Sequence, residues 1–271
     1  MPPSAKWSFN QKFWDHLTAI RIDRTVVSTC LTLLRSCPSH LESFRCINPT
    51  ISLSGHTFRL PLRIPSRLAQ FEWTGGLGSL DEYFWQNVKL PVVCDLTWNL
   101  LEPLKESQTQ IRREFFRQLS NVQKMKMEFY SGINELRDVW RSLDKLQELH
   151  LDACRLQKQG GPDIMDALTL CHDCGHQNVL PNLRVLEIEI LIGSSSTITR
   201  MLRSRRDSPL LREGQMALGF DVDQGPIRLE RSVLHMEQLD WEQGDREKLN
   251  VLVAAGLLLD IYVGDDHLSS F

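Results

Sequence analysis

The residues best suited to chemistry lie together in one short stretch, Cys171-His172-Asp173-Cys174-Gly175-His176. Thiolates and imidazoles are the ligands that Zn²⁺ prefers, so Cys171, Cys174 and His176 could fill three positions of a tetrahedral site. His172 or Cys154 could then be the fourth ligand. A structural zinc site usually has a second half-site at matching spacing, and the sequence has none. A surface loop is therefore the favoured interpretation, and a zinc site is the alternative.

Other motifs for catalysis or phosphate binding are weak. Gly75-Gly76-Leu77-Gly78 has no following lysine-serine or lysine-threonine pair, so a turn is favoured over a phosphate-binding loop. A group of arginines could meet phosphate or an acidic partner, yet the solvated end of a helix is the favoured interpretation. These arginines are Arg200, Arg203, Arg205 and Arg206. The sequence shows no nucleophile–base, HExxH or paired-carboxylate motif. We therefore expect a protein that is not an enzyme and that needs no cofactor.

A leucine pattern in the middle of the chain indicates the elements that would position a site. Leu146–Leu156 (LQELHLDACRL) follows L-x-x-L-x-L-x-x-C-x-L, which is typical of one leucine-rich repeat. Leu149 and Leu151 are two residues apart, so on a strand both point into a core. His150 and Asp152 then point outward. Because one such turn cannot bury its own apolar face, the chain must contain others.

An apolar triplet at positions i, i+3 and i+5 recurs along the chain. Successive triplets begin 24 to 29 residues apart, with one last interval of 37, and leucine-rich repeats have a period of roughly 20–29 residues. A large apolar residue or a proline also stands three residues before each triplet. The common period and this extra column favour a repeat over coincidence. The triplets are Leu17-Ile20-Ile22, Leu41-Phe44-Cys46, Leu68-Phe71-Trp73, Val93-Leu96-Trp98, Val122-Met125-Met127, Leu146-Leu149-Leu151 and Leu183-Leu186-Ile188.

The segments between the triplets should supply helices. Thr25–Arg35, Ser107–Leu119 and Ile133–Leu143 carry apolar residues at helical spacing. In the second of these we expect Arg112, Arg113 and Glu114 to lie largely on the face opposite the apolar residues. Further elements expected are helices at Thr197–Ser204 and Asp245–Ala255, strands at Gln215–Val222 and Leu257–Val263, and short extended pieces at Ile51–Leu53 and Thr57–Leu60.

Together these elements predict an α/β fold. We expect a leucine-rich repeat solenoid, with a curved parallel sheet on the concave side and helices on the convex side. The whole chain, 1–271, is predicted to form a single domain. The clearer repeats span about 14–190, with an inserted loop at 157–180, and divergent repeats with a C-terminal cap occupy 191–271.

Composition gives no sign of a nucleic acid or a membrane as partner. The net charge is −3, and the hydrophobic fraction of 42% is ordinary for a globular protein. The N-terminal residues MPPSAKW lack the apolar core of a secretory signal, and the apolar run Val251–Leu259 is too short to span a bilayer. The 7 cysteines lack a tight spacing framework, which fits free thiols in a reducing compartment. A cytoplasmic or nuclear protein is expected.

Three segments resemble the leucine-rich regions of fungal F-box-like proteins: Leu34–Phe44 (LRSCPSHLESF), Leu180–Ile188 (LPNLRVLEI) and Met201–Arg206 (MLRSRR). The resemblance implies a substrate-recognition subunit of a ubiquitin ligase, whose F-box would dock on the ligase adaptor while the repeats select the substrate. The F-box itself, about forty residues with a Leu-Pro start, is not found before the first repeat, which begins near Trp14. Docking on an adaptor would therefore need an F-box elsewhere.

Outward residues of the repeats are the candidate binding residues for a protein partner. Between the last two apolar positions of each triplet stand Arg21, Arg45, Glu72, Thr97, Lys126, His150 and Glu187. One position beyond each triplet stand Asp23, Ile47, Thr74, Asn99, Glu128, Asp152 and Glu189. The C-terminal half of this face is acidic, which favours a basic protein segment; the alternative is that an exposed strand face simply needs polar residues. A protein-binding module is thus the expected function, and an enzyme or zinc-binding protein with a loop site around Cys171, Cys174 and His176 is the alternative.

Overall fold

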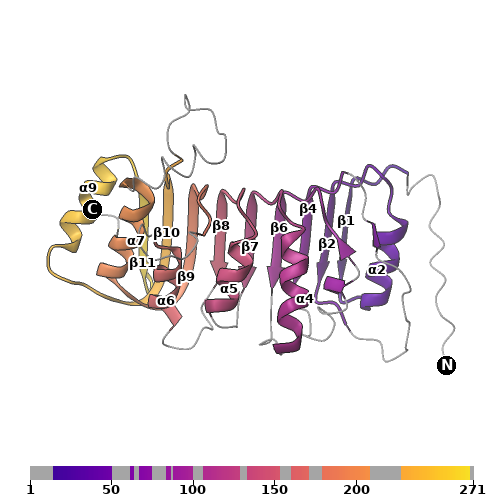
Figure 1. Ribbon diagram of the computed structural model, residues 1–271, viewed down its shortest axis with the longest axis horizontal. Coiled ribbons are helices and arrows are strands. Elements are labelled where there is room, and N and C mark those ends of the chain that lie inside the picture. The colour runs from indigo at the N-terminus through magenta and orange to yellow at the C-terminus, as the bar shows by residue number, and fades with distance from the viewer. Residues whose placement is uncertain are drawn as a thin grey trace.

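A largely parallel sheet runs the length of the molecule (Figure 1). The computed structural model describes residues 15–50, 62–63, 67–74, 84–86, 88–99, 106–128, 133–152, 160–170, 179–207 and 227–268. Within these ranges the fold is mixed α/β, with an open ten-stranded sheet in the order β1-β2-β4-β6-β7-β8-β9-β10-β11-β12 and a small pair, β3-β5. The first strands are β1 (Ala19–Asp23), β2 (Ser43–Ile47), β3 (Leu62–Arg63), β4 (Gln70–Thr74), β5 (Val88–Lys89) and β6 (Asp95–Asn99). The others are β7 (Lys124–Glu128), β8 (Glu148–Asp152), β9 (Val185–Ser194), β10 (Arg231–Asp240), β11 (Leu258–Val263) and β12 (Asp266–His267).

Each apolar triplet of the sequence ends on a strand of the large sheet, so the predicted strand positions are confirmed. The strands pair in parallel with the triplets aligned: Phe44 lies opposite Phe71, for example, and Leu149 lies opposite Leu186. Alignment follows from the side-chain period of two, because a slip by one residue would move the whole apolar set to the solvent face. Only β12 pairs antiparallel among the strands described.

Trp98 lies at the centre of the aromatic part of the core. Its side chain is fully buried, and its ring packs against those of Trp73 on the neighbouring strand and Phe115 on a helix, at centroid distances of 6.3 and 5.4 Å. Phe71 and Phe84 complete the cluster at 6.3 and 5.3 Å. The inward side chains of the sheet and the apolar faces of the helices thus form one continuous core.

The helices that connect the strands cover the inward face of the sheet. They are α2 (Val27–Ser36), α4 (Glu106–Arg117), α5 (Ile133–Trp140), α6 (Gly160–Leu168), α7 (Ser195–Asp207) and α9 (Asp245–Ala254). The three helices expected between the first triplets are therefore confirmed as α2, α4 and α5. The expected outward position of Arg112 is wrong, because its side chain is fully buried. Arg112 is four residues before Phe116 and three before Phe115, so helical geometry puts it on the same face as these rings.

Helix α6 corrects the expectation of an inserted loop at 157–180. Residues 160–168 are helical, and Ile164, Met165 and Leu168 are buried at helical spacing. Pro162 lies in the first turn, where a missing backbone N–H costs little. Residues 171–178, with Cys171, Cys174 and His176, lie outside the described ranges.

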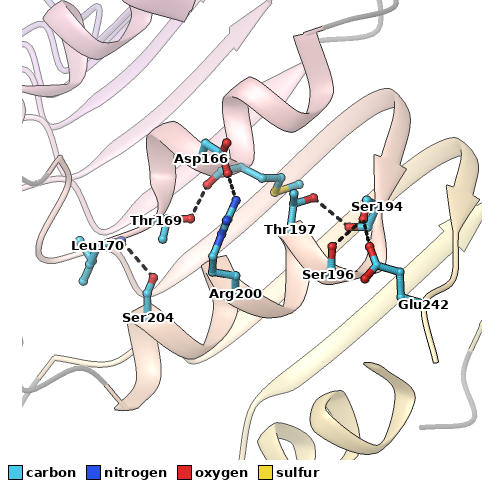
Figure 2. A network of polar contacts seen from close by, with 10 residues as sticks. Asp166, Thr169, Leu170, Ser194, Ser196, Thr197, Arg200, Ser204 and Glu242 are labelled. Carbon is cyan, nitrogen blue, oxygen red and sulfur yellow. Dashed lines mark hydrogen bonds and ion pairs between the residues drawn. The ribbon is translucent and has the colours of Figure 1, made fainter. Parts of the chain in front are cut away.

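Polar contacts hold α6 and α7 together behind β9 (Figure 2). Arg200 of α7 forms an ion pair with Asp166 of α6, and the backbone N–H of Leu170 donates to Ser204 Oγ at 3.0 Å. At the other end of α7, Ser194 Oγ donates to Glu242 Oε1 at 3.1 Å. Helix α7 is therefore fixed at both ends, with no loop between it and β9.

Two arginines of α7 are buried, so the prediction of a solvated or ligand-binding basic patch is wrong for Arg205 and Arg206. Arg205 donates to the carbonyls of Leu168, Leu180 and Val179 at 2.6, 2.8 and 3.0 Å. Arg206 donates to the carbonyls of Leu229, at 2.7 Å, and Ala255. Both guanidinium groups thus satisfy backbone carbonyls between elements of the C-terminal part.

The C-terminal part of the chain continues the parallel sheet. The expected helices are present as α7 and α9, and Gly256 follows α9 with φ 91°, the left-handed conformation expected of a glycine cap. The expected last strand is present as β11. Strand β10 was not predicted, because the buried polar residue Ser232 stands where earlier triplets have Phe, Leu or Met.

A buried carboxylate links the first turn of α9 to the start of α7. Asp245 accepts hydrogen bonds from Ser195 Oγ and Lys248 Nζ, both at 2.7 Å. Ser195 Oγ in turn accepts from the backbone N–H of Glu242 at 2.9 Å. The bond from Lys248, and then that from Ser195, lower the pKa of Asp245 below its usual value.

We expect Asp245→Asn to lower the free energy of unfolding by about 1–2 kcal/mol at neutral pH, because two hydrogen bonds lose their charged acceptor. A depressed folded-state pKa stabilises the protein above the unfolded pKa and is lost as pH falls through the folded value. The difference between the variant and the wild type should therefore shrink below about pH 4. Urea unfolding across a pH series measures it, with the exposed Asp144→Asn as control; a difference independent of pH would contradict this assignment.

Several predictions fall outside the described residues. They are the extended pieces at Ile51–Leu53 and Thr57–Leu60, the turn at Gly75–Gly78 and the strand at Gln215–Val222. The cysteines in the described ranges, Cys30, Cys37, Cys46 and Cys94, are free thiols, as expected. None of the helices described has both the length and the apolar character needed to cross a bilayer.

Candidate binding face

The face of the sheet opposite the helices is here called the open face, and two of its columns of side chains hold the sequence-predicted binding residues. In the first outer column, neighbouring strands bring together Arg21, Arg45, Glu72, Thr97, Lys126, His150, Glu187, Val233 and Asp260. In the second outer column, strand pairing aligns Asn99, Glu128, Asp152, Glu189, His235 and Tyr262 at the C-terminal end. Adjacent members lie on strands roughly 4.8 Å apart.

Exposure distinguishes the open face from the core face along β7 and β8. On β7, Lys124 and Lys126 are exposed while Met125 and Met127 are fully buried. On β8 the pattern repeats, with His150 and Asp152 partly exposed between and beyond the buried leucines. The inward residues are therefore committed to the core, and the outward residues remain accessible.

Charges on the N-terminal half of the open face are of both signs. Arg21 and Arg45 are exposed and adjacent, and Arg45 Nε lies 3.5 Å from Glu72 Oε2 on the next strand. Further along, Asn99 Nδ2 donates to Glu128 Oε2 at 2.9 Å. This half is thus a mixed polar surface with basic residues at its beginning.

The C-terminal half of the open face is hollowed. The hollow has a volume of about 410 Å³, within the range of roughly 300–1,000 Å³ for ligand clefts. We call it the acidic hollow. It is lined by Lys126, His150, Leu151, Asp152, Glu187, Glu189, His235, Met236, Glu237, Gly264 and Asp265.

Carboxylates dominate the acidic hollow. Its lining has five of them against one lysine, and His150 Nδ1 lies 2.8 Å from Glu187 Oε2, a contact that joins β8 to β9. Glu189 and Glu237 are exposed on β9 and β10. Leu151 and Met236 also line the hollow, but their side chains are only 2% and 4% exposed and belong to the core. The hollow is therefore an acidic cleft on the open face.

A stack of rings extends the second outer column beyond the acidic hollow. His235 and Tyr262 stack with centroids 4.6 Å apart and ring planes within 9° of parallel. Tyr262 stacks in turn on His267 of β12 at 4.5 Å. His235 lines the hollow, whereas the ring of Tyr262 lies between the two imidazoles. Of the three stacked rings, the one that lines the hollow is therefore His235.

The structure brings several of the sequence-predicted binding residues together and separates others. Lys126, His150, Asp152, Glu187 and Glu189 all line the acidic hollow. The remaining candidates, Arg21, Arg45, Glu72 and Thr97, share the open face but lie outside the hollow.

Sequence reasoning missed His235, Glu237 and Asp265. The alternation in Leu234-His235-Met236-Glu237 was the signal that could have found the first two. Asp265 lies in the turn between β11 and β12, and only the fold places it beside them.

The residues of the zinc alternative lie outside those that the structure describes. Cys171, Cys174 and His176 lie outside them, and Cys154 and His172 do too. Among the described residues, no group of three or more His, Cys, Asp or Glu side chains is arranged to hold a metal ion.

Fold and site together define a mixed α/β protein with an open, largely parallel sheet and a cleft on its helix-free face. Comparison with known protein families finds none that matches this chain, and comparison with curated proteins finds no match. The function must therefore be argued from the open face itself.

Proposed function

We propose that this protein is a protein-binding module of the leucine-rich repeat type, which holds its partner on the open face. The observation that carries the proposal is the alignment of the outer columns: parallel strands from Ala19 to Tyr262 present aligned outward side chains, most of which are accessible. The inward side chains are buried in the core, so the outward side chains are the ones that can contact a partner. Solenoid repeat proteins use such sheets as extended binding surfaces.

The acidic hollow favours binding over the simpler explanation that an exposed strand face needs polar residues. Solubility alone would be served by any mixture of charges, whereas this face concentrates carboxylates around a cleft of ligand size. The period of 24–29 residues over the first six triplets supports the repeat assignment.

A narrower proposal follows from the resemblance of Leu34–Phe44 and Leu180–Ile188 to fungal F-box-like proteins. In that case the open face selects the substrate of a ubiquitin ligase, and an F-box located elsewhere docks on the adaptor. Co-purification of an adaptor and a cullin would support this narrower function. Recovery of a partner without an adaptor or a cullin would support the binding module and contradict the ligase assignment.

We expect Thr97→Trp to abolish capture of the natural partner, because it places a bulky ring in the middle of the first outer column. A tagged chain is used to capture partners, which are quantified by mass spectrometry. The matched control is Arg203→Trp on α7, an exposed site on the helical side. Partners that bind the open face should be lost at least about tenfold with the first variant and retained with the second. Equal recovery with both variants would contradict the proposal.

A further inference from the structure

We propose that the acidic hollow binds an arginine side chain carried by an extended, basic segment of the partner protein. This inference rests on the proposed function and deepens it, because it assigns a chemical class to the partner. The arguments are the charge of the hollow, its size and the ring of His235 on its wall.

Charge selects a cationic occupant. Glu189, Glu237 and Asp265 line the hollow in addition to Asp152 and the paired Glu187, whereas Lys126 is the one lysine in the lining. Like charges brought together across an interface are strongly unfavourable, so an acidic peptide, a phosphate group or a nucleic acid would be repelled. A segment that supplies positive charge would be attracted, and the cleft would strengthen that attraction.

The wall of the hollow favours a guanidinium over an ammonium group. His235 lies between Glu189 and Tyr262 in the second outer column, and Tyr262 covers one face of its ring. On the other side of His235 in this column stands Glu189, and both residues line the hollow. A planar guanidinium can stack on such a ring while its N–H groups donate to a carboxylate in bidentate fashion. Lysine offers a point charge that cannot do both.

The size of the hollow suits a single long side chain. Leu151 and Met236 contribute little side-chain surface to it, because both side chains are buried in the core on the helical side of the sheet. The volume of about 410 Å³ is small for a protein domain and adequate for side chains of an extended segment.

The experiment is a titration of the purified full chain with a labelled peptide in which paired arginines alternate with serine, followed by fluorescence anisotropy at low salt. Two comparison peptides replace arginine by lysine or by citrulline, which keeps the shape and loses the charge. We expect the arginine peptide to bind most tightly, the lysine peptide several-fold more weakly, and the citrulline peptide at least about tenfold more weakly.

Variants localise the binding. Glu189→Gln with Glu237→Gln should weaken the arginine peptide about tenfold, because two exposed carboxylates of the hollow lose their charge. His235→Ala should reduce the preference for arginine over lysine while leaving part of the affinity. The matched control is Asp144→Asn with Glu247→Gln, two exposed acids outside the hollow, and it should change nothing. Urea unfolding of each variant verifies that the fold is intact.

Each outcome decides between the proposals. Equal binding of all three peptides, equal weakening by the hollow and control variants, or no binding of the arginine peptide would overturn the inference. If the natural partner is lost with Thr97→Trp but unaffected by the Glu189→Gln/Glu237→Gln pair, the binding module stands and the arginine site fails. If the chain sediments as a dimer that the same pair dissociates, the hollow is occupied by a second copy, whose Arg21 and Arg45 would supply the charge.

Discussion

Replacing Trp98 by alanine is expected to lower the free energy of unfolding by about 4 kcal/mol, as large-to-small changes of buried aromatic residues do. The indole is fully buried and packs on rings from several other elements, including Phe84 at 5.3 Å and Phe115 at 5.4 Å. Its removal leaves a cavity in the middle of the aromatic core, which the rigid sheet cannot close. Urea unfolding measures the loss of stability, with far-UV circular dichroism as the signal in place of tryptophan fluorescence.

Trp98→Phe is the matched control for this prediction. Nε1 of Trp98 has no hydrogen-bond partner within the described part of the protein, so phenylalanine loses volume but no hydrogen bond. We expect a loss of about 1.5 kcal/mol or less for this variant. Thr97→Ala, one residue away on the open face, should change the stability by about 0.5 kcal/mol at most. A loss of stability from Trp98→Ala no greater than that from Thr97→Ala would show that the rings do not form a common core.

The strand frame of the sheet from β1 to β9 could be predicted from sequence because it rests on large apolar residues at fixed spacing. Leu149 and Leu151 must both face the core, and this requirement alone places His150 and Asp152 on the other face. The same logic put five of the hollow's lining residues among the predicted binding residues. The compartment, the partner and the ligase connection have no comparable local determinant.

The missed features are those in which a polar residue occupies a position that the fold buries. Strand β10, which carries His235 and Glu237, does not fit the triplet pattern because that pattern requires an apolar residue at the position of Ser232. The charge of Arg205 predicts a surface residue. Yet it lies seven residues after Ile198 and three after Leu202, on the face of α7 that the helix buries. The helical spacing of Arg205 from buried residues therefore predicts its burial better than its charge does.

Helix α6 was missed for a different reason. Gly160-Gly161-Pro162 is typical of a loop, and these residues outweighed the helical spacing of Ile164, Met165 and Leu168. Proline and glycine are tolerated at a helix start, so they marked the beginning of the helix here and not its absence. Packing of α6 against β9, which comes later in the chain, then stabilises the helix.

Arg205→Met is expected to lower the free energy of unfolding by about 4 kcal/mol, although methionine fills much of the same volume. The substitution leaves the carbonyls of Leu168, Leu180 and Val179 buried without their donors, and each unsatisfied group costs about 1–3 kcal/mol. Burial lowers the pKa of Arg205 to about 9, which leaves the guanidinium cationic at neutral pH and its hydrogen bonds charge-assisted. Urea unfolding measures the loss, with the exposed Arg203→Met as matched control.

Arg205→Met should also destabilise the acidic hollow, because Arg205 donates hydrogen bonds to the segment that leads into β9. Leu180 has φ 51°, a conformation uncommon for a residue with a side chain, and the bond from Arg205 to its carbonyl helps to hold it there. Strand β9, which begins at Val185, carries Glu187 and Glu189 into the hollow. We therefore expect faster amide hydrogen exchange across β9 in Arg205→Met and unchanged exchange in β2. Equal acceleration in both strands would mean that Arg205 supports the whole sheet and not the hollow in particular.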